Sequence, residues 1–222
     1  MFNVLRNEPT PASLANKQRY DSEDVWEALN KVFHKKCYIC ETSEPLDINV
    51  EHFVPHKGDE DLKFDWNNLY FSCARCNNIK LAKYDSLLDC CDPNTDVIQA
   101  IKHLPPSTPY AKHLQIEAKY DDDKTKITAE FLNKIFNSDH TPNKKVSSSS
   151  LRRKVFDQYN LLFEELNNYY APKALQRDKE DAIERMKLLL KPTSPYSAFI
   201  SWCIIEDEEL GPMLQDFIGI VE

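Results

Sequence analysis

Four cysteines in two closely spaced pairs are the residues of this chain best suited to bind a metal ion. The pairs are Cys37-x-x-Cys40 and Cys73-x-x-Cys76. Four thiolates at this spacing suit tetrahedral zinc, and a zinc ion with four protein ligands stabilises a fold rather than reacting with a substrate. We therefore expect a structural zinc ion bound by all four.

A second set of ligands, of oxygen and imidazole type, lies between and just after the cysteine pairs. Glu51 and His52 are adjacent, and Asn77 follows the second pair directly. Carboxylate and amide oxygens suit Mg²⁺ or Mn²⁺, which keeps several waters and takes a substrate phosphate as a further ligand. Histidine can accept a proton from water near neutral pH. The three residues together predict metal-dependent hydrolysis of a phosphodiester.

The expected local structure limits how Glu51 and His52 can work together. Residues 48–54 are rich in β-branched side chains, which is typical of a strand, and Pro55 would end it. Adjacent side chains on a strand point to opposite faces. The pair can serve one site only where the strand ends, with Glu51 reaching back toward a helix and His52 facing the phosphate.

The elements around the motif follow from periodicity and turn residues. Acidic residues at 21–24 precede apolar residues at helical spacing, so residues 21–33 are expected to form a helix that leads into the first cysteine pair. Residues 57–61 are expected to form an exposed loop, residues 68–72 a second strand, and residues 77–84 a helix.

The ordered motif resembles that of the HNH endonuclease family, which has a zinc-braced ββα-metal fold. The residues that carry the resemblance are Cys37-x-x-Cys40, Glu51-His52-x-x-Pro55, Asn68-Leu69 and Cys73-x-x-Cys76-Asn77-x-x-Lys80, within about residues 37–83. The resemblance implies that His52 is the general base and that Glu51 and Asn77 bind the catalytic metal. It also implies that Asn68 holds the loop and orients the base. Lys80 follows on the same helix, where it can approach a substrate phosphate.

Two positions depart from the commoner family pattern. Glu51 stands where aspartate is commoner, and Asn77 stands at a helix position that is histidine in other members. An amide oxygen there favours Mg²⁺ or Mn²⁺ over zinc or nickel as the catalytic metal. His56 is either a phosphate contact and alternative base or an ordinary loop histidine, and Asn78 is the alternative if Asn77 is not the ligand.

Composition and charge restrict the possible functions. The chain has 222 residues, three glycines and a net charge of −8, and it lacks a glycine-rich phosphate loop. No apolar leader or membrane-length segment is visible, so we expect a cytoplasmic protein whose cysteines stay reduced. Proteins that bind nucleic acid through their own surface usually carry a basic face. A partner is therefore expected to deliver the substrate, unless the positive charge is local.

The remaining chain is expected to be mixed and mainly helical, which makes the protein α+β. We expect a nuclease domain at residues 1–90 and a mixed α/β region for partner docking at residues 91–222. A hairpin is expected from residues 114–120 and 124–128 around Asp121–Asp123, whose carboxylates are more typical of a solvated turn than of a metal site. Helices are expected at 129–137, 151–170 and 177–190, with a flexible stretch before residue 151. Residues 196–220 are expected to cap the core or, alternatively, to dock a partner.

The remaining cysteines and histidines carry no motif. Cys90 and Cys91 are open to interpretation as ligands or redox thiols, but cysteine is a small hydrophobe and these two are expected to be buried and inert. His103, His113 and His140 lie outside any ligand spacing.

The layout of the whole chain resembles the nuclease subunits of the Septu antiphage defence systems, a resemblance that rests on the N-terminal helix and on the 92–96 segment. That resemblance implies an ATPase subunit as partner and a hetero-oligomer. DNA is the favoured substrate. The alternatives are cleavage of tRNA or other RNA, and a non-catalytic zinc module that binds nucleic acid or protein.

Overall fold

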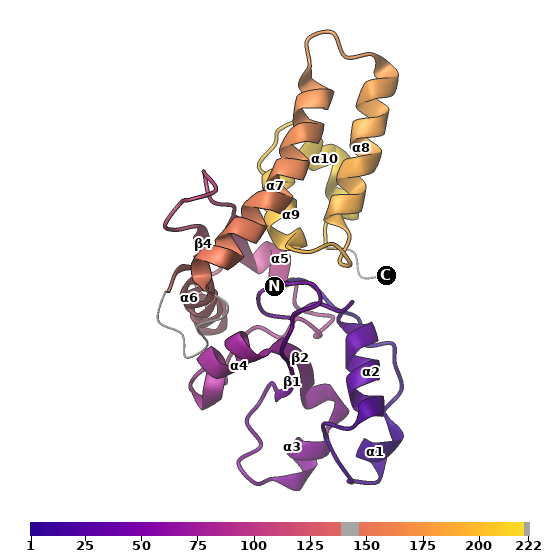
Figure 1. Cartoon of the computed structure of the whole chain (residues 1–222), viewed down its shortest axis with the longest axis vertical. Coiled ribbons are helices and arrows are strands. Elements are labelled where there is room, and N and C mark those ends of the chain that lie inside the picture. The colour runs from indigo at the N-terminus through magenta and orange to yellow at the C-terminus, as the bar shows by residue number, and fades with distance from the viewer. Residues whose placement is uncertain (139–146, 220–222) are drawn as a thin grey trace.

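The computed structural model describes residues 1–138 and 147–219 and has an α+β architecture (Figure 1). His140, part of the stretch expected to be flexible and the last residue of the 196–220 segment lie outside the described residues. In the described residues, no helix is both long and apolar enough to cross a membrane.

The first part of the chain builds two antiparallel strands and a helix packed on them. Its elements are α1 (Ala12–Ala15), α2 (Glu23–Val32), β1 (Ile48–His52), α3 (Glu60–Phe64), the 3-10 helix η1 (Trp66–Asn68), β2 (Leu69–Cys73), α4 (Ala74–Lys80) and the 3-10 helix η2 (Leu81–Lys83). β1 pairs with β2 so that Glu51 lies opposite Tyr70 and His52 opposite Leu69. α4 contacts both strands, which gives the expected ββα arrangement.

Local sequence explains where these elements begin. α2 starts after Ser22 with two acidic residues in its first turn and buries Val25, Leu29 and Val32, as predicted. α4 begins at Ala74 rather than at residue 77, so the predicted helix start was wrong. Cys73 is the N-cap of α4, and its sulfur accepts the backbone N–H of Cys76 at 3.5 Å. The second cysteine pair is therefore part of the helix start.

The second part of the chain is mainly helical. Its elements are α5 (Val97–Ala100), β3 (Ile101–Leu104), β4 (Gln115–Ala118), α6 (Asp123–Asn137), α7 (Ser148–Tyr170), α8 (Gln176–Leu190), α9 (Ser197–Ile205), α10 (Leu210–Leu214) and the 3-10 helix η3 (Gln215–Phe217). The predicted helices at 129–137, 151–170 and 177–190 are confirmed within α6, α7 and α8. The α7–α8 hairpin extends away from α1, α2 and α3 (Figure 1).

The predicted hairpin around residues 121–123 was wrong, although a β-hairpin is present nearby. β4 pairs with the earlier strand β3, and residues 124–128 belong to α6. Asp122 is the N-cap of α6 and accepts the backbone N–H of Thr125 at 2.9 Å. This cap starts the helix immediately after the strand, so the acidic triplet is a helix terminus.

The apolar core consists of two clusters that share α9. The larger cluster contains side chains from α2, β1, β2, α4 and α6, and it continues past residue 90. The smaller cluster lies between the second half of α7, α8, α9 and α10. Phe199 belongs to the first cluster, whereas Ile200 and Ile204 belong to the second. The C-terminal segment therefore caps the core, and the division at residue 90 stays a prediction.

His103 is a fully buried titratable group in the larger core region. Its Nδ1 donates to the carbonyl of Ile101 at 2.9 Å. Burial is the main cause that lowers the pKa of His103 to about 3, whereas an unfolded histidine titrates near 6.5. The unfolded chain therefore binds this proton more readily than the folded one. Stability is lost as the pH falls below about 6.5.

We predict that His103→Gln flattens the pH dependence of stability. At pH 5, His103 should account for a loss of about 2 kcal/mol in the free energy of unfolding relative to neutral pH. Urea denaturation at pH 7 and pH 5 measures this difference. The exposed His113 provides the control His113→Gln, which should keep the wild-type slope. Equal slopes for His103→Gln and wild type would contradict the prediction.

Candidate active site and metal centre

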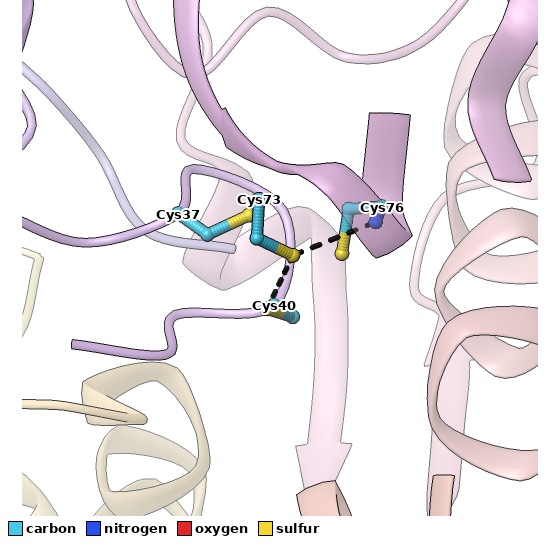
Figure 2. A group of neighbouring side chains, drawn as sticks. All are labelled: Cys37, Cys40, Cys73 and Cys76. Carbon is cyan, nitrogen blue, oxygen red and sulfur yellow. Dashed lines mark hydrogen bonds between the residues drawn. The ribbon is translucent and has the colours of Figure 1, made fainter. Parts of the chain in front are cut away.

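The four predicted zinc ligands come together at one point (Figure 2). Their sulfur atoms all lie within 4.8 Å of one another, and the Cys40 and Cys73 sulfurs are 3.9 Å apart. Zinc–sulfur bonds of about 2.3 Å in a tetrahedron place neighbouring sulfurs about 3.8 Å apart. The sulfur positions therefore fit a zinc ion with four cysteine ligands.

The backbone around the first pair forms a tight turn that presents the two thiols. Cys37 N–H donates to the carbonyl of Thr42 at 3.1 Å, and Glu41 N–H donates to the carbonyl of Cys37 at 2.9 Å. Glu41 adopts a positive φ of 58°, which closes the turn. The Thr42 hydroxyl lies 3.2 Å from the Cys40 sulfur and can stabilise its thiolate.

We predict that Cys76→Ser lowers the bound zinc from one ion per chain to nearly none. Because metal binding free energy adds to folding free energy, the unfolding free energy should fall by several kcal/mol, to an order of magnitude. Elemental analysis and thermal unfolding of the purified protein measure both effects. Cys203 lies outside the four-sulfur group, so the control variant Cys203→Ser should keep the zinc. Full zinc content in Cys76→Ser would count against this site.

A pocket of 310 Å³ lies beside the end of β1 and the last turn of α4. It is lined by five of the predicted site residues, Glu51, His52, His56, Asn77 and Lys80, together with Tyr20, Val50, Pro55, Lys57 and Leu81. β1 ends at His52, so the adjacent Glu51 and His52 both reach the same pocket, as the position of Pro55 had indicated. The predicted alternative Asn78 is exposed and does not line it.

His52 is held in an orientation that suits a general base. Its Nε2 lies 3.0 Å from the backbone carbonyl of Lys63, and a carbonyl can only accept, so Nε2 carries the proton. In the described part of the chain, no residue hydrogen-bonds its Nδ1, which is therefore an available proton acceptor. The rings of Tyr20 and His56 flank it at centroid distances of 4.8 and 4.7 Å. Burial lowers the pKa of His52, so the imidazole is neutral at neutral pH.

Glu51 is buried and carries one carboxylate oxygen that has no partner. Its Oε1 accepts from the Lys80 ammonium at 2.7 Å, whereas Oε2 has no hydrogen-bond partner. Burial raises the pKa of Glu51, and the Lys80 charge opposes that rise. Asn77 donates its amide nitrogen to Asn49 Oδ1 at 3.2 Å, which leaves its own Oδ1 as an acceptor. Carboxylate and amide oxygens are hard donors of the kind that bind Mg²⁺ or Mn²⁺, and the role of Glu51 and Asn77 as metal ligands stays a prediction.

Lys80 lies at the back of the pocket rather than at its mouth. It is buried, and its ammonium also donates to the carbonyls of Phe53 at 2.8 Å and His52 at 3.3 Å. It therefore neutralises Glu51 and fixes the backbone at the end of β1. Contact between Lys80 and a substrate phosphate stays a prediction.

Asn68 lies outside the pocket and ties together the backbone that supports it. Its Oδ1 accepts the N–H of Val54 at 2.7 Å, and its amide nitrogen donates to the carbonyls of Val54 at 2.9 Å and Leu62 at 3.0 Å. These bonds fix both ends of the loop that carries Pro55 and His56. Leu62 immediately precedes Lys63, whose carbonyl holds His52. The geometry matches the loop-holding position expected of Asn68, and its role in orienting the base stays a prediction.

We predict that Asn68→Ala destabilises the fold by about 3 kcal/mol, because the buried Asn68 side chain is lost and the backbone groups of Val54 and Leu62 lose their partners. Chemical denaturation measures the change, and hydrogen exchange of the Val54 amide should become faster. The neighbouring Asn67 is exposed and supplies the control Asn67→Ala, which should cost little. A stability change no larger than that of the control would refute the prediction.

Two features of the site could not be predicted from any sequence motif. Tyr20 precedes α2 and reaches His52 only through the packing of the N-terminal segment. Lys63 contributes its backbone carbonyl, which no side-chain motif records. His56 is placed beside His52, and its Nδ1 accepts the N–H of Gly58 at 3.2 Å.

The fold is a ββα domain with a four-cysteine group that could hold zinc, and Glu51, His52 and Asn77 line one pocket of this domain. Residues 37–83 match the model of the HNH endonuclease family, and this segment is therefore an HNH endonuclease domain.

Two curated proteins are similar to part of the chain. Septu protein PtuB of Bacillus mycoides (strain KBAB4) is 33% identical over 82 residues, which cover 30% of this chain and 28% of that protein. Septu protein PtuB of Bacillus thuringiensis is 30% identical over 92 residues, which cover 34% of this chain and 36% of that protein. The matches thus span only about a third of each relative's length. No solved structure matches the chain.

Proposed function

We propose that this chain is a metal-dependent HNH endonuclease that hydrolyses phosphodiester bonds of nucleic acid, with DNA as the favoured substrate. The observation that carries the proposal is the pocket at the end of β1. Glu51, His52 and Asn77 all line this pocket, and their side chains supply a carboxylate, an imidazole and an amide. The family match at residues 37–83 supports the same activity.

His52 acts as the general base in this proposal. The Lys63 carbonyl holds the proton on Nε2, so Nδ1 accepts the proton of the attacking water. The protonated imidazole is then stabilised by the same carbonyl. Tyr20 and His56 limit rotation of the ring. Holding the base in one orientation lowers the cost of reaching the reactive geometry.

Glu51 and Asn77 would hold the catalytic metal ion. A bound Mg²⁺ or Mn²⁺ supplies charge neutralisation at the phosphate and at the leaving oxygen. The Lys80 ammonium pairs with Oε1 of Glu51 and so compensates the negative charge of this buried carboxylate. A zinc ion held by the four cysteines would brace the start of α4, three residues before Asn77 along the same helix.

We further propose a place in antiphage defence, in the cytoplasm, with an ATPase subunit resembling PtuA as partner. The similarity to Septu protein PtuB supports this placement. The net charge of −8 also supports it, since a partner that binds nucleic acid removes the need for a basic surface on this chain. The α7–α8 hairpin offers a docking surface, because Leu161, Phe163, Leu175 and Leu188 are exposed along it.

We predict that His52→Ala lowers the cleavage rate by about 100-fold or more, because the general base is lost while the fold remains. Purified protein, alone and co-expressed with the neighbouring gene products, is incubated with plasmid DNA or total tRNA. Each reaction contains Mg²⁺, Mn²⁺ or EDTA. His113→Ala, at an exposed histidine outside the pocket, should retain wild-type activity.

The arms of this experiment separate the alternatives. Metal-dependent cleavage of tRNA but not DNA would redirect the substrate assignment to RNA. Activity that requires the neighbouring products would support the ATPase partner. Equal activity of His52→Ala and wild type would refute the catalytic role and leave a zinc-binding module.

A further inference from the structure

Asp89, Cys90 and Cys91 form a second group of sulfur and carboxylate atoms, separate from the four-cysteine group. Their sulfur and carboxylate ligand atoms all lie within 4.8 Å of one another. The chain turns here, because Cys91 N–H donates to Asp89 Oδ1 at 2.8 Å and Asp92 N–H donates to the Asp89 carbonyl at 3.3 Å. Neighbouring side chains on an extended chain point apart. The turn instead brings two adjacent thiols together.

The two thiols differ in their access to solvent. Cys90 is only 2% exposed, whereas Cys91 is partly exposed. A reagent that arrives from solvent therefore meets Cys91 first and finds Cys90 behind it. The sequence had indicated that both would be buried; this is confirmed for Cys90, whereas Cys91 is only partly buried.

Arg6 provides positive charge beside this pair. Its guanidinium donates to the carbonyls of Trp66 at 3.1 Å and Leu69 at 2.6 Å and has no carboxylate within ion-pair distance among the described residues. The neighbouring Cys90 thiol is the largest cause that lowers the pKa of Cys91; burial opposes this shift, and the Arg6 charge supports it. Partly exposed thiols beside arginine are the ones that react as thiolates.

The group is better suited to thiol chemistry than to a metal ion. Asp89 Oδ1 already accepts the Tyr70 hydroxyl at 2.5 Å and the Cys91 N–H. Zinc sites in proteins use at least three protein ligands, whereas this turn offers two sulfurs and one aspartate that already accepts two hydrogen bonds.

We propose that Cys90 and Cys91 form a reversible redox site that hydrogen peroxide oxidises to a disulfide. The Cys91 thiolate attacks one peroxide oxygen, the O–O bond breaks, and the departing hydroxide takes a proton to become water. Cys91 is then a sulfenic acid, and the peroxide is reduced. The Cys90 sulfur attacks the Cys91 sulfur, the S–O bond breaks, and the hydroxide leaves with the Cys90 proton as a second water. The products are one disulfide and two waters.

The reversibility follows from the spacing of the two residues. Adjacent Cα atoms across a trans peptide are about 3.8 Å apart, which is closer than the spacing of about 4.4–6.8 Å found in ordinary disulfides. The resulting bond is strained, and strained disulfides are the readily reduced ones. A thiol reductant should therefore restore the dithiol.

The redox site is connected to the pocket through Tyr70. The Tyr70 hydroxyl binds Asp89, and Tyr70 lies opposite Glu51 in the β1–β2 ladder. Its ring stacks on Phe53 at 4.8 Å, and the Phe53 carbonyl accepts from Lys80. Closing the disulfide changes the turn that holds Asp89, and so acts on the strand that carries Glu51. The Cys90–Cys91 site would control the proposed nuclease through oxidation, and this regulatory role rests on the proposed function. The redox chemistry itself does not depend on nuclease activity.

The test treats the full-length, zinc-loaded protein with hydrogen peroxide and follows intact mass, tryptic peptides and zinc content. Wild type should lose two hydrogens in the peptide that contains Cys90 and Cys91, keep its zinc, and regain the original mass with dithiothreitol. Cys91→Ser should react at least about tenfold more slowly. Cys90→Ala should stop at a Cys91 sulfenic acid that dimedone traps.

Cys203→Ser is the matched control and should react like wild type, because burial raises the pKa of Cys203 to about 12. Oxidation of Cys91→Ser at the wild-type rate, or passage of Cys91 to sulfinic acid without any disulfide, would overturn the proposal. Loss of a second zinc equivalent in untreated Cys91→Ser would do the same, since it would assign a metal site. Cys91 is partly exposed, so Cys91→Ser gives a result even if Cys90→Ala fails to fold.

Discussion

The convergence of four sulfur atoms fixes the part of the molecule on which the candidate site depends. The first pair lies in a tight turn and the second at the start of α4, and the chain between them contains β1, α3, η1 and most of β2. A small two-stranded sheet is not stable alone in water. A zinc ion shared by the turn and the helix would hold both ends of this segment. Asn77 directly follows the last cysteine, so a zinc ion bound there would also fix the position of Asn77.

Glu51 and His52 can line the same pocket because β1 ends at His52. Glu51 and His52 are adjacent and would face opposite sides of a regular strand. His52 is the last strand residue, so its ring turns toward the Lys63 carbonyl while Glu51 reaches across to α4. Lys80 compensates the buried carboxylate and also binds the two carbonyls that follow it. Lys80 therefore both compensates the charge of Glu51 and fixes the backbone at the end of β1.

The sequence predicts the local parts of this arrangement well and the long-range parts poorly. The convergence of the four cysteines and the placement of Glu51, His52 and Asn77 along one pocket follow from short spacings within a strand, a turn and a helix start. The inward position of Lys80 could not be predicted, because an i+3 residue on a short helix faces the core or the solvent according to tertiary packing. Tyr20 and the Lys63 carbonyl meet His52 only after the N-terminal segment and α3 have packed. Residues 124–128 form part of a helix rather than the expected strand, because the cap at Asp122 starts α6 there.

α9 contributes side chains to both apolar clusters, so neither cluster is complete until α9 has been synthesised and has packed. Trp202 donates from its ring to the Ile98 carbonyl, and Ser197 donates to the Glu41 carboxylate beside the first cysteine pair. These contacts join residues that are far apart in the chain, and such contacts form late in folding. During synthesis from the N-terminus, the HNH segment emerges well before the helix that covers the Glu41 carboxylate. The α7–α8 hairpin is made before α9, so a chain whose core is complete always carries the proposed docking helices.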